Sequence, residues 1–393
     1  MPVSPNPDLS EPRHSPMLWV LGLITLALRS GSELTKLVGE IHHTATDRPL
    51  PWDRQHRPDI ARAPKPYLFI KILLEQLATT IHGGVGQLPT NGVPHNLVRV
   101  RSALNGVVGD KLHDWHHPLT QPMEFVDEFG HKLCLASLQQ KSPRGVVLFV
   151  HGLCLSEFDW QSPAHGRFVE QVRAEGFGVA WLRYNTGLPV WENGEQLANL
   201  IHQQWAGNPL GKQLRLVGHS MGGLIIRSAV FQSQHMLQHR WCDDLTHSAY
   251  LATPHDGAPL EKAGELANRL LGITPYSKPL MALGNIRSRG IRSLRYGWIH
   301  QPQDRQQHQS IFPFHQDSEH LLLAAKLYSD PTSAWVGDGL VPQASALGGP
   351  HFPSEHPKVT RVLVEDMGHI RLLQDQRTYD ALSQWWGLNS GAL

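Results

Sequence analysis

Hydrophobic residues from about residue 122 onward gather in short runs that are separated by helix-length intervals. Each run has the length and the apolar content of a buried strand. The runs are VVLFV (146–150), GVAWLR (178–183), LRLV (214–217), SAYLAT (248–253), LLLAAKLY (321–328) and KVTRVLV (358–364). Strands that alternate with helices predict an α/β domain over residues 122–390, with a mostly parallel sheet flanked by helices.

Two parts of this domain depart from the plain alternation. The segment MEFVDEFGHKLCLASL at 123–138 predicts two strands around a turn at Phe129 and Gly130. The interval between the runs at 248–253 and 321–328 is too long for a simple crossover connection. We therefore expect a cap or lid insertion, with helices of its own, over residues 256–320.

The amino-terminal part of the chain has a helical pattern instead. Residues 1–16 are rich in Pro and Ser and predict a disordered start. The apolar run at 17–28 is shorter than the roughly 20 residues that a membrane-spanning helix needs, but apolar residues continue as far as Ile41 at spacings of three and four. A second helical pattern covers 67–84 and ends in a pair of glycines. We expect a helical appendage over residues 17–112.

The first helix of this appendage is expected either to pack on the main domain or to lie on a membrane surface through residues 17–45. Asp8 and Glu11 precede the apolar run, and no clean cleavage site follows it, so a secretory signal peptide is the less favoured interpretation. We expect a cytoplasmic or peripherally membrane-associated protein.

Composition and charge argue against several other classes. The formal net charge of +1 gives no bulk attraction to nucleic acid. The three cysteines show no C-x-x-C spacing, and the histidine pairs at 42–43 and 116–117 lack further ligands at helical or hairpin spacing. Neither a disulfide framework nor a metal site is expected.

The segment GHSMGG at 218–223 lies between a predicted strand and an apolar helical pattern. A strand that turns directly into a helix strains the backbone of the residue at the turn, and the neighbouring residues must be small so that strand and helix can approach. Here Gly218, His219 and Gly222 surround Ser220. The serine then projects above the sheet near the positive end of the helix, where negative charge is stabilised. This G-x-S-x-G arrangement predicts a catalytic nucleophile.

A serine hydroxyl needs a base to take its proton and an acid to orient that base. For a serine at such a turn, the acid and then the base follow it in the chain. His369 comes directly after the predicted strand KVTRVLV, whereas His351 and His356 precede that strand in a Pro- and Gly-rich loop and are expected at the surface. His369 is therefore the expected base.

For the acid the sequence leaves three candidates. Asp338 has a glycine on each side in a loop after the predicted strand at 321–328, so its carboxylate can approach an imidazole. Asp330 is nearer to the end of that strand, and Asp366 precedes His369 in the same loop. We predict Asp338, with Asp330 as the runner-up.

The tetrahedral intermediate of acyl transfer needs two hydrogen-bond donors for its oxyanion. One is expected from the backbone N–H of Met221, directly after the nucleophile. The loop after the first buried strand begins with His151 and Gly152, which on their own also fit a simple tight turn. The second donor is expected in this loop, from the N–H of Leu153 and in part from that of Cys154.

Together these motifs resemble a known family. GHSMGG, the His-Gly turn, YLATPHDGAP (250–259), GDGLVP (337–342) and MGH (367–369) resemble the lipases and esterases of the α/β-hydrolase superfamily. In particular they are similar to bacterial proteins related to the catalytic domain of GPI inositol-deacylases. The resemblance covers about residues 120–390 and implies an α/β-hydrolase fold, a Ser-His-Asp triad with its acid on the GDG loop, and no cofactor. It speaks against dehalogenases and epoxide hydrolases, which need Asp in place of Ser220.

The expected activity is hydrolysis of a carboxylic ester through an acyl-enzyme on Ser220. A small-molecule or lipid ester is the expected substrate, and an apolar lid with amphipathic amino-terminal helices favours a lipid. A thioesterase or an acyltransferase uses the same triad, because the pocket selects the acyl group and the acceptor. A noncatalytic binding protein with this fold is a further alternative, although its usual mark is a broken triad.

Overall fold

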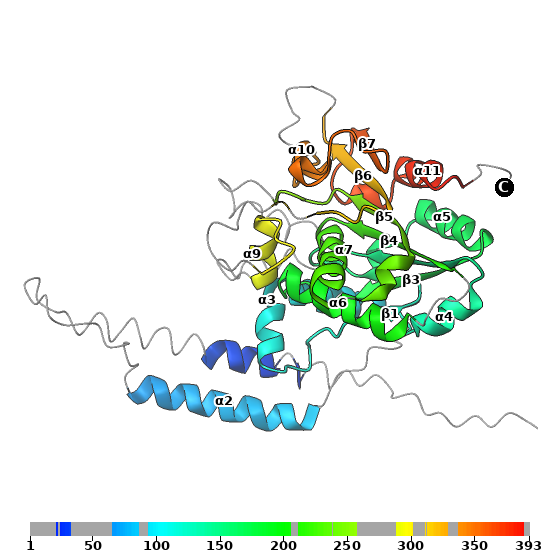
Figure 1. Cartoon of the computed structure of the whole chain (residues 1–393). Coiled ribbons are helices and arrows are strands. Elements are labelled where there is room, and N and C mark those ends of the chain that lie inside the picture. Colours follow the sequence, from blue (N-terminus) through cyan, green and yellow to red (C-terminus); the bar gives the residue numbers. More distant parts are fainter. Residues whose placement is uncertain are drawn as a thin grey trace, which may run out of the picture. The chain divides into compact units, whose positions relative to one another are not determined.

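A computed structural model gives the structure of the chain (Figure 1). The described residues are 21–22, 24–32, 65–85, 93–205, 211–237, 239–257, 288–301, 311, 313–328 and 337–388. The chain divides into two compact units, which are described separately here: residues 1–89 with 114–119, and residues 90–113 with 120–393.

The first unit is helical where it is described. Residues 24–32 form a helix, in which the Thr25 hydroxyl lies 2.9 Å from Nε2 of His117. Helix α2 (Lys65–Val85) agrees with the helical pattern predicted at 67–84.

Several expectations for this unit lie outside the described residues. They include the disordered start at 1–16 and most of the membrane-contact segment at 17–45. In the described part of the chain, no helix combines the length and the hydrophobicity that crossing a bilayer requires.

The second unit is built on a seven-stranded sheet with the order β1-β3-β2-β4-β5-β6-β7. β1 is antiparallel to β3, and all other neighbours are parallel. All six predicted runs form strands, and the predicted mostly parallel, helix-flanked sheet is confirmed. The expected burial is not confirmed for β7, the edge strand, in which only Val364 is buried. The strands are β1 (Glu124–Val126), β2 (Gly145–Val150), β3 (Phe177–Arg183), β4 (Gln213–His219), β5 (Leu245–Leu251), β6 (Glu319–Lys326) and β7 (Val359–Glu365).

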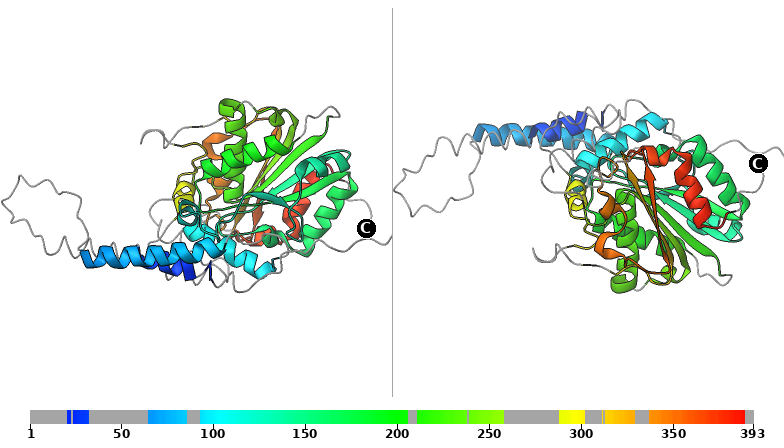
Figure 2. Two further views of the ribbon diagram at one scale, coloured as in Figure 1. Left: turned by 90° about the horizontal axis from the view of Figure 1, so that it is seen from below. Right: turned by 90° about the horizontal axis from the view of Figure 1, so that it is seen from above.

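Helices cover both faces of this sheet (Figure 2). α5 (Pro163–Ala174) and α11 (Gln376–Trp385) pack together on one face, where the rings of Phe168 and Trp386 are stacked. α6 (Val190–Gln204) and α7 (Met221–Gln232) pack together on the other. Because the strands from β2 onward are parallel, their carboxyl ends meet at one edge, where ligands of such sheets bind.

One predicted strand is wrong. In the segment 123–138 only β1 pairs with the sheet, and its second half contributes a single bridge between Val126 and Lys132. Residues from Leu135 onward form helix α4 (Leu135–Lys141). Leu135 and Gln139, which are one helical turn apart, are the buried residues of this segment, and this spacing fits a helix rather than a strand.

The boundary predicted for the amino-terminal appendage also differs from the structure. Helix α3 (His95–Asp114) falls in the predicted appendage of residues 17–112, but residues 90–113 belong to the second unit. The side-chain amide of Asn185, after β3, donates to the main-chain oxygen of Gly109 (2.8 Å), which joins α3 to the sheet.

The predicted cap at 256–320 lies in large part outside the described residues. Residues 258–287, 302–310 and 312 are not described. Helix α9 (Arg289–Arg295) is the described helix within this interval.

Candidate active site

The turn between β4 and α7 has the strained geometry that the sequence predicts. Ser220 has φ +54° and ψ −124°, a backbone conformation that residues other than glycine rarely adopt. A Cβ added to Gly218 would lie 2.5 Å from the nitrogen of Gly223, and one added to Gly222 would lie 2.3 Å from the oxygen of Val150. Only glycine fits at these two positions, so the sequence of the turn is dictated by the close approach of strand, helix and the neighbouring β2.

His369 and Asp338 are brought together by two loops at the carboxyl edge of the sheet. Nδ1 of His369 lies 2.6 Å from Oδ2 of Asp338, and both side chains are almost fully buried. The other carboxylate oxygen, Oδ1, accepts from the N–H groups of Leu340 (2.9 Å) and Val341 (2.8 Å). The carboxylate is therefore held by the GDG loop and aimed at the histidine, as a base and its orienting acid require.

The other candidates for acid and base take different places. Asp366 is exposed in the loop before His369, and Asp330 lies outside the described residues. The expectation that His351 is a surface residue is wrong. Its side chain is only 11% exposed, and its Nε2 lies 3.1 Å from Oδ1 of Asp256, because the loop at 349–352 folds back onto the loop after β5.

His219 links the base loop to the nucleophile turn. Its Nε2–H donates to the main-chain oxygen of His369 (3.0 Å), and the two rings lie 4.7 Å apart. Burial, followed by the neighbouring His369, lowers the pKa of His219 well below its usual value. The ring is therefore neutral, and the carbonyl acceptor fixes its single proton on Nε2.

Ser220 is connected to His369 and Asp338 less directly than these two are to each other. Among the described residues no hydrogen bond connects its hydroxyl to the His369 ring, and the connection runs through the adjacent His219. In enzymes without substrate this bond is commonly long and tightens in the complex. The geometry thus brings His369 and Asp338 into contact, and His219 joins their loop to the turn that carries Ser220.

The loop after β2 lies against Ser220. A Cβ added to Gly152 would lie 3.0 Å from Cβ of Ser220, so only a small residue fits there. In the described part of the chain the N–H groups of Leu153 and Met221 donate to no protein acceptor. The N–H of Cys154 is engaged, because it donates to Oγ1 of Thr186 (3.2 Å). Leu153 and Met221 therefore remain the candidate oxyanion donors, whereas the N–H of Cys154 already has an acceptor.

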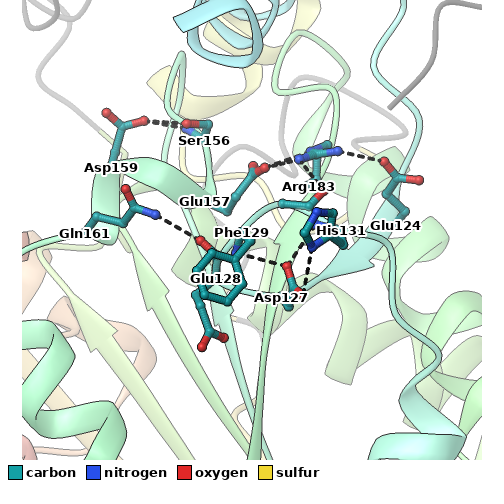
Figure 3. Close-up of polar contacts among 11 residues, drawn as sticks. Glu124, Asp127, Glu128, Phe129, His131, Ser156, Glu157, Asp159, Gln161 and Arg183 are labelled. Atoms are coloured by element: carbon teal, nitrogen blue, oxygen red, sulfur yellow. Dashed lines mark hydrogen bonds and ion pairs between the residues drawn. The ribbon is translucent and has the colours of Figure 1, made fainter. Parts of the chain in front are cut away.

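Polar side chains that the sequence reasoning missed hold this loop in place (Figure 3). Arg183, at the end of β3, bonds Glu157 through Nε (2.9 Å) and also through Nη2, and its Nη1 bonds Glu124 (3.2 Å). The hydroxyl of Tyr184 donates to the main-chain oxygen of His151 (2.7 Å). In the sequence, Arg183 and Tyr184 only follow a buried-strand pattern, and nothing there indicates their partners, which are distant in the chain.

The structure describes no group of three or more His, Cys, Asp or Glu side chains that is arranged to hold a metal ion. Two surface cavities, of about 570 Å³ and about 470 Å³, lie along α5. Neither of them is lined by Ser220, Asp338 or His369, so these cavities are separate from the candidate site.

Comparisons with known proteins agree with this picture at a coarse level. Residues 140–294 match the model of a family described as "Putative serine esterase (DUF676)". No curated protein matches the chain in sequence.

Solved structures with a similar fold include the mature lipase BlEst2 of Bacillus licheniformis, with 18% identity over 68% of this chain and 98% of that chain, and a TM-score of 0.43. They also include an esterase of Thermogutta terrifontis (16%, 68% and 93%, TM-score 0.38) and a monoacylglycerol lipase of Paleococcus ferrophilus (13%, 67% and 97%, TM-score 0.38). At such low identities the likeness says nothing about substrate.

Proposed function

We propose that this chain is a serine hydrolase that cleaves carboxylic esters through an acyl-enzyme formed on Ser220. The observation that carries the proposal is the buried 2.6 Å hydrogen bond between His369 and Asp338, in a loop that His219 ties to the nucleophile turn. The match of residues 140–294 to a family of serine esterases supports the same reaction class.

In the proposed reaction, Nε2 of His369 takes the proton of the Ser220 hydroxyl while the serine oxygen attacks the ester carbonyl. Asp338 accepts from Nδ1, which keeps Nε2 unprotonated before attack and stabilises the imidazolium afterwards. The N–H groups of Leu153 and Met221 stabilise the oxyanion of the tetrahedral intermediate. The imidazolium protonates the leaving alcohol, and the same histidine then activates the water that releases the acid. No step requires a cofactor.

Lipid or long-chain acyl esters are the proposed substrates. Helix α2 exposes four large apolar side chains, each by 44% or more: Ile70, Ile72, Leu73 and Leu77. Three of them follow the helical spacing of three and four that places side chains on one face. Exposed apolar helix faces of this kind suit contact with a lipid surface. Membrane contact through residues 17–45, a cytoplasmic or peripheral location, and the likeness to GPI inositol-deacylases belong to the same proposal.

The lipid part of the proposal is tested with p-nitrophenyl esters from acetyl to palmitoyl, with and without phosphatidylcholine vesicles. Wild type is compared with Leu73→Gln/Leu77→Gln, with a chain lacking residues 1–66, and with Thr79→Gln as a control on another side of α2. The proposal expects a preference for long acyl chains and sedimentation with vesicles, both weakened in the first two variants. Equal preference in all variants, with no protein in the vesicle pellet, would count against it.

Thioester hydrolysis and acyl transfer use the same three residues, and a parallel assay separates them. Acyl-CoA and p-nitrophenyl esters of equal chain length are compared, with glycerol added as an acceptor. The proposal expects free acid as the main product and faster turnover of the ester. Glyceride as the main product would identify an acyltransferase, and a folded chain that is inert toward every substrate would identify a binding protein.

A further inference from the structure

Helix α3 precedes the sheet in the chain and lies outside the residues that match the esterase family. All residues from 101 to 110 are buried, although several of them are polar. A helix that is buried over ten consecutive residues has neighbours on all sides, and those that belong to the second unit can be named.

The first neighbour of α3 is the loop that carries the Leu153 N–H. A Cβ added to Gly106 would lie 2.2 Å from Sγ of Cys154, 3.0 Å from its Cα and 3.1 Å from its nitrogen. Such distances leave room only for glycine. Cys154 itself has φ +61°, and its N–H donates to Thr186 on the other side. The residue next to Leu153 is thus fixed between α3 and Thr186.

The same turn of α3 contacts two more segments at the carboxyl edge of the sheet. In the loop after β3, a Cβ added to Gly187 would lie 2.2 Å from the main-chain oxygen of Asn105. At the start of α9, the hydroxyl of Ser288 donates to the main-chain oxygen of Gly106 (2.7 Å), and the N–H of Arg289 donates to Oδ2 of Asp110 (2.9 Å). These contacts fix α3 itself, so it is a firm support for the loop after β2.

The amino-terminal half of α3 holds the far end of that loop. Nη2 of Arg99 donates to the main-chain oxygen of Phe158 (2.8 Å), and Nε lies 3.6 Å from Asp159. In the same loop, Glu157 accepts from Arg183 (Figure 3). The loop from Leu153 to Asp159 therefore contacts α3 at both of its ends, by close packing at Cys154 and by a hydrogen bond at Phe158.

We propose that α3 is a positioning element of the esterase site, in which Gly106 sets the position of Cys154 and so of the Leu153 N–H relative to Ser220. This role rests on the proposed function. An oxyanion exists only in the transition state and the intermediate, so a displaced Leu153 N–H weakens catalysis and leaves substrate binding unchanged. The expected effect of moving it is a lower kcat at constant KM.

The test is Gly106→Ala, compared with Gly166→Ala in α5, where an added Cβ meets nothing within 4 Å. Removing one oxyanion donor costs roughly 100- to 1,000-fold in kcat, so a displaced donor is expected to cost about 10- to 100-fold. KM is expected to stay within about twofold, and Gly166→Ala to keep the wild-type kcat. In Gly106→Ala/Cys154→Ala the nearest clashing atom, Sγ, is removed while the Cα and nitrogen of residue 154 remain at 3.0 and 3.1 Å, so part of the lost kcat is expected to return.

Two results would overturn the role of α3. One is a folded Gly106→Ala with wild-type kcat, and the other is a loss of kcat that the double variant does not reduce. If Gly106→Ala does not fold, Thr186→Val and Thr186→Ser test the other support of Cys154, and equal kcat in these two variants contradicts the proposal. A wild-type chain that is inert toward all esters overturns the proposed function itself, whereas an active wild type with an unaffected Gly106→Ala overturns only this inference.

Discussion

Replacing Asp338 by Asn is expected to invert the tautomer of the proposed catalytic histidine. Oδ1 of Asp338 accepts two backbone N–H groups, and Oδ2 accepts from Nδ1 of His369. In Asp338→Asn the two backbone donors require the amide oxygen at the Oδ1 position, so the amide NH₂ group faces His369. Nδ1 must then accept, and the ring proton moves to Nε2. A histidine protonated at Nε2 cannot take the proton of Ser220.

The size of the effect follows from this inversion. Loss of the correct tautomer in a Ser-His-Asp triad lowers kcat by roughly 10⁴, which corresponds to about 5.4 kcal/mol in the activation free energy. Folding is expected to suffer little, because the side-chain volume and both backbone hydrogen bonds of Asp338 are kept. One charge-assisted bond becomes a neutral one, which costs about 1 kcal/mol and lowers Tm by roughly 2 °C.

The assay is kcat/KM for p-nitrophenyl butyrate between pH 5 and 9, together with Tm by differential scanning fluorimetry. Asp366→Asn is the matched control, since Asp366 is exposed and asparagine tolerates its φ of +52°. Wild-type kinetics are expected for this control. A folded Asp338→Asn that keeps more than a tenth of the activity, or an inactive Asp366→Asn, would refute the reasoning.

Three further predictions concern the surroundings of the site. His219→Leu removes the donor to the buried His369 carbonyl and is expected to lower the free energy of unfolding by about 1–3 kcal/mol and kcat by about tenfold. His219→Gln keeps a donor and is expected to retain more of both. If the two variants lose the same stability in urea unfolding and the same kcat, the hydrogen bond does not hold the His369 loop. Burial, and then the charge of Arg173, lowers the pKa of His165 to about 3, so the unfolded chain binds a proton below about pH 6.5 that the folded chain refuses, and stability falls as the pH falls. Between pH 7 and pH 5, the free energy of unfolding of His165→Phe, measured with urea, is expected to fall by roughly 2 kcal/mol less than that of wild type. The same fall in both proteins would contradict this. Gly222→Ala places a Cβ 2.3 Å from the oxygen of Val150 and is expected to lower Tm and abolish ester hydrolysis, which wild-type values in both measurements would disprove.

The strands of the second unit could be predicted because parallel strands that are buried on both faces have continuous apolar runs. All residues of β2 and β3 are buried, and their apolar residues do not recur at the helical spacing of three and four. The turn around Ser220 could also be predicted, since Gly218 and Gly222 are required by the close approach of backbone atoms. In α4 the local pattern was ambiguous, and burial against the sheet decided it.

The rest depends on contacts between residues that are distant in the chain. α3 was predicted as part of an appendage, but it contacts the loops that follow β2 and β3. The tie between His219 and His369 spans 150 residues, and that between Cys154 and Thr186 spans 32. Glycines at 106 and 109 of α3 were the one signal of close packing, and nothing in the sequence says what packs there. The flanking glycines favoured Asp338 over Asp366, but the contact of its carboxylate with His369 joins residues 31 positions apart and is seen only in the structure.

The most direct test of the proposed function compares wild type with Ser220→Ala for covalent labelling by a fluorophosphonate and for turnover of p-nitrophenyl esters. Both proteins are first shown to be folded by circular dichroism and Tm. Labelling and turnover in wild type, with neither in Ser220→Ala, is the predicted result. Equal labelling and turnover in both proteins, or a folded wild type that shows neither, would contradict a nucleophilic role for Ser220.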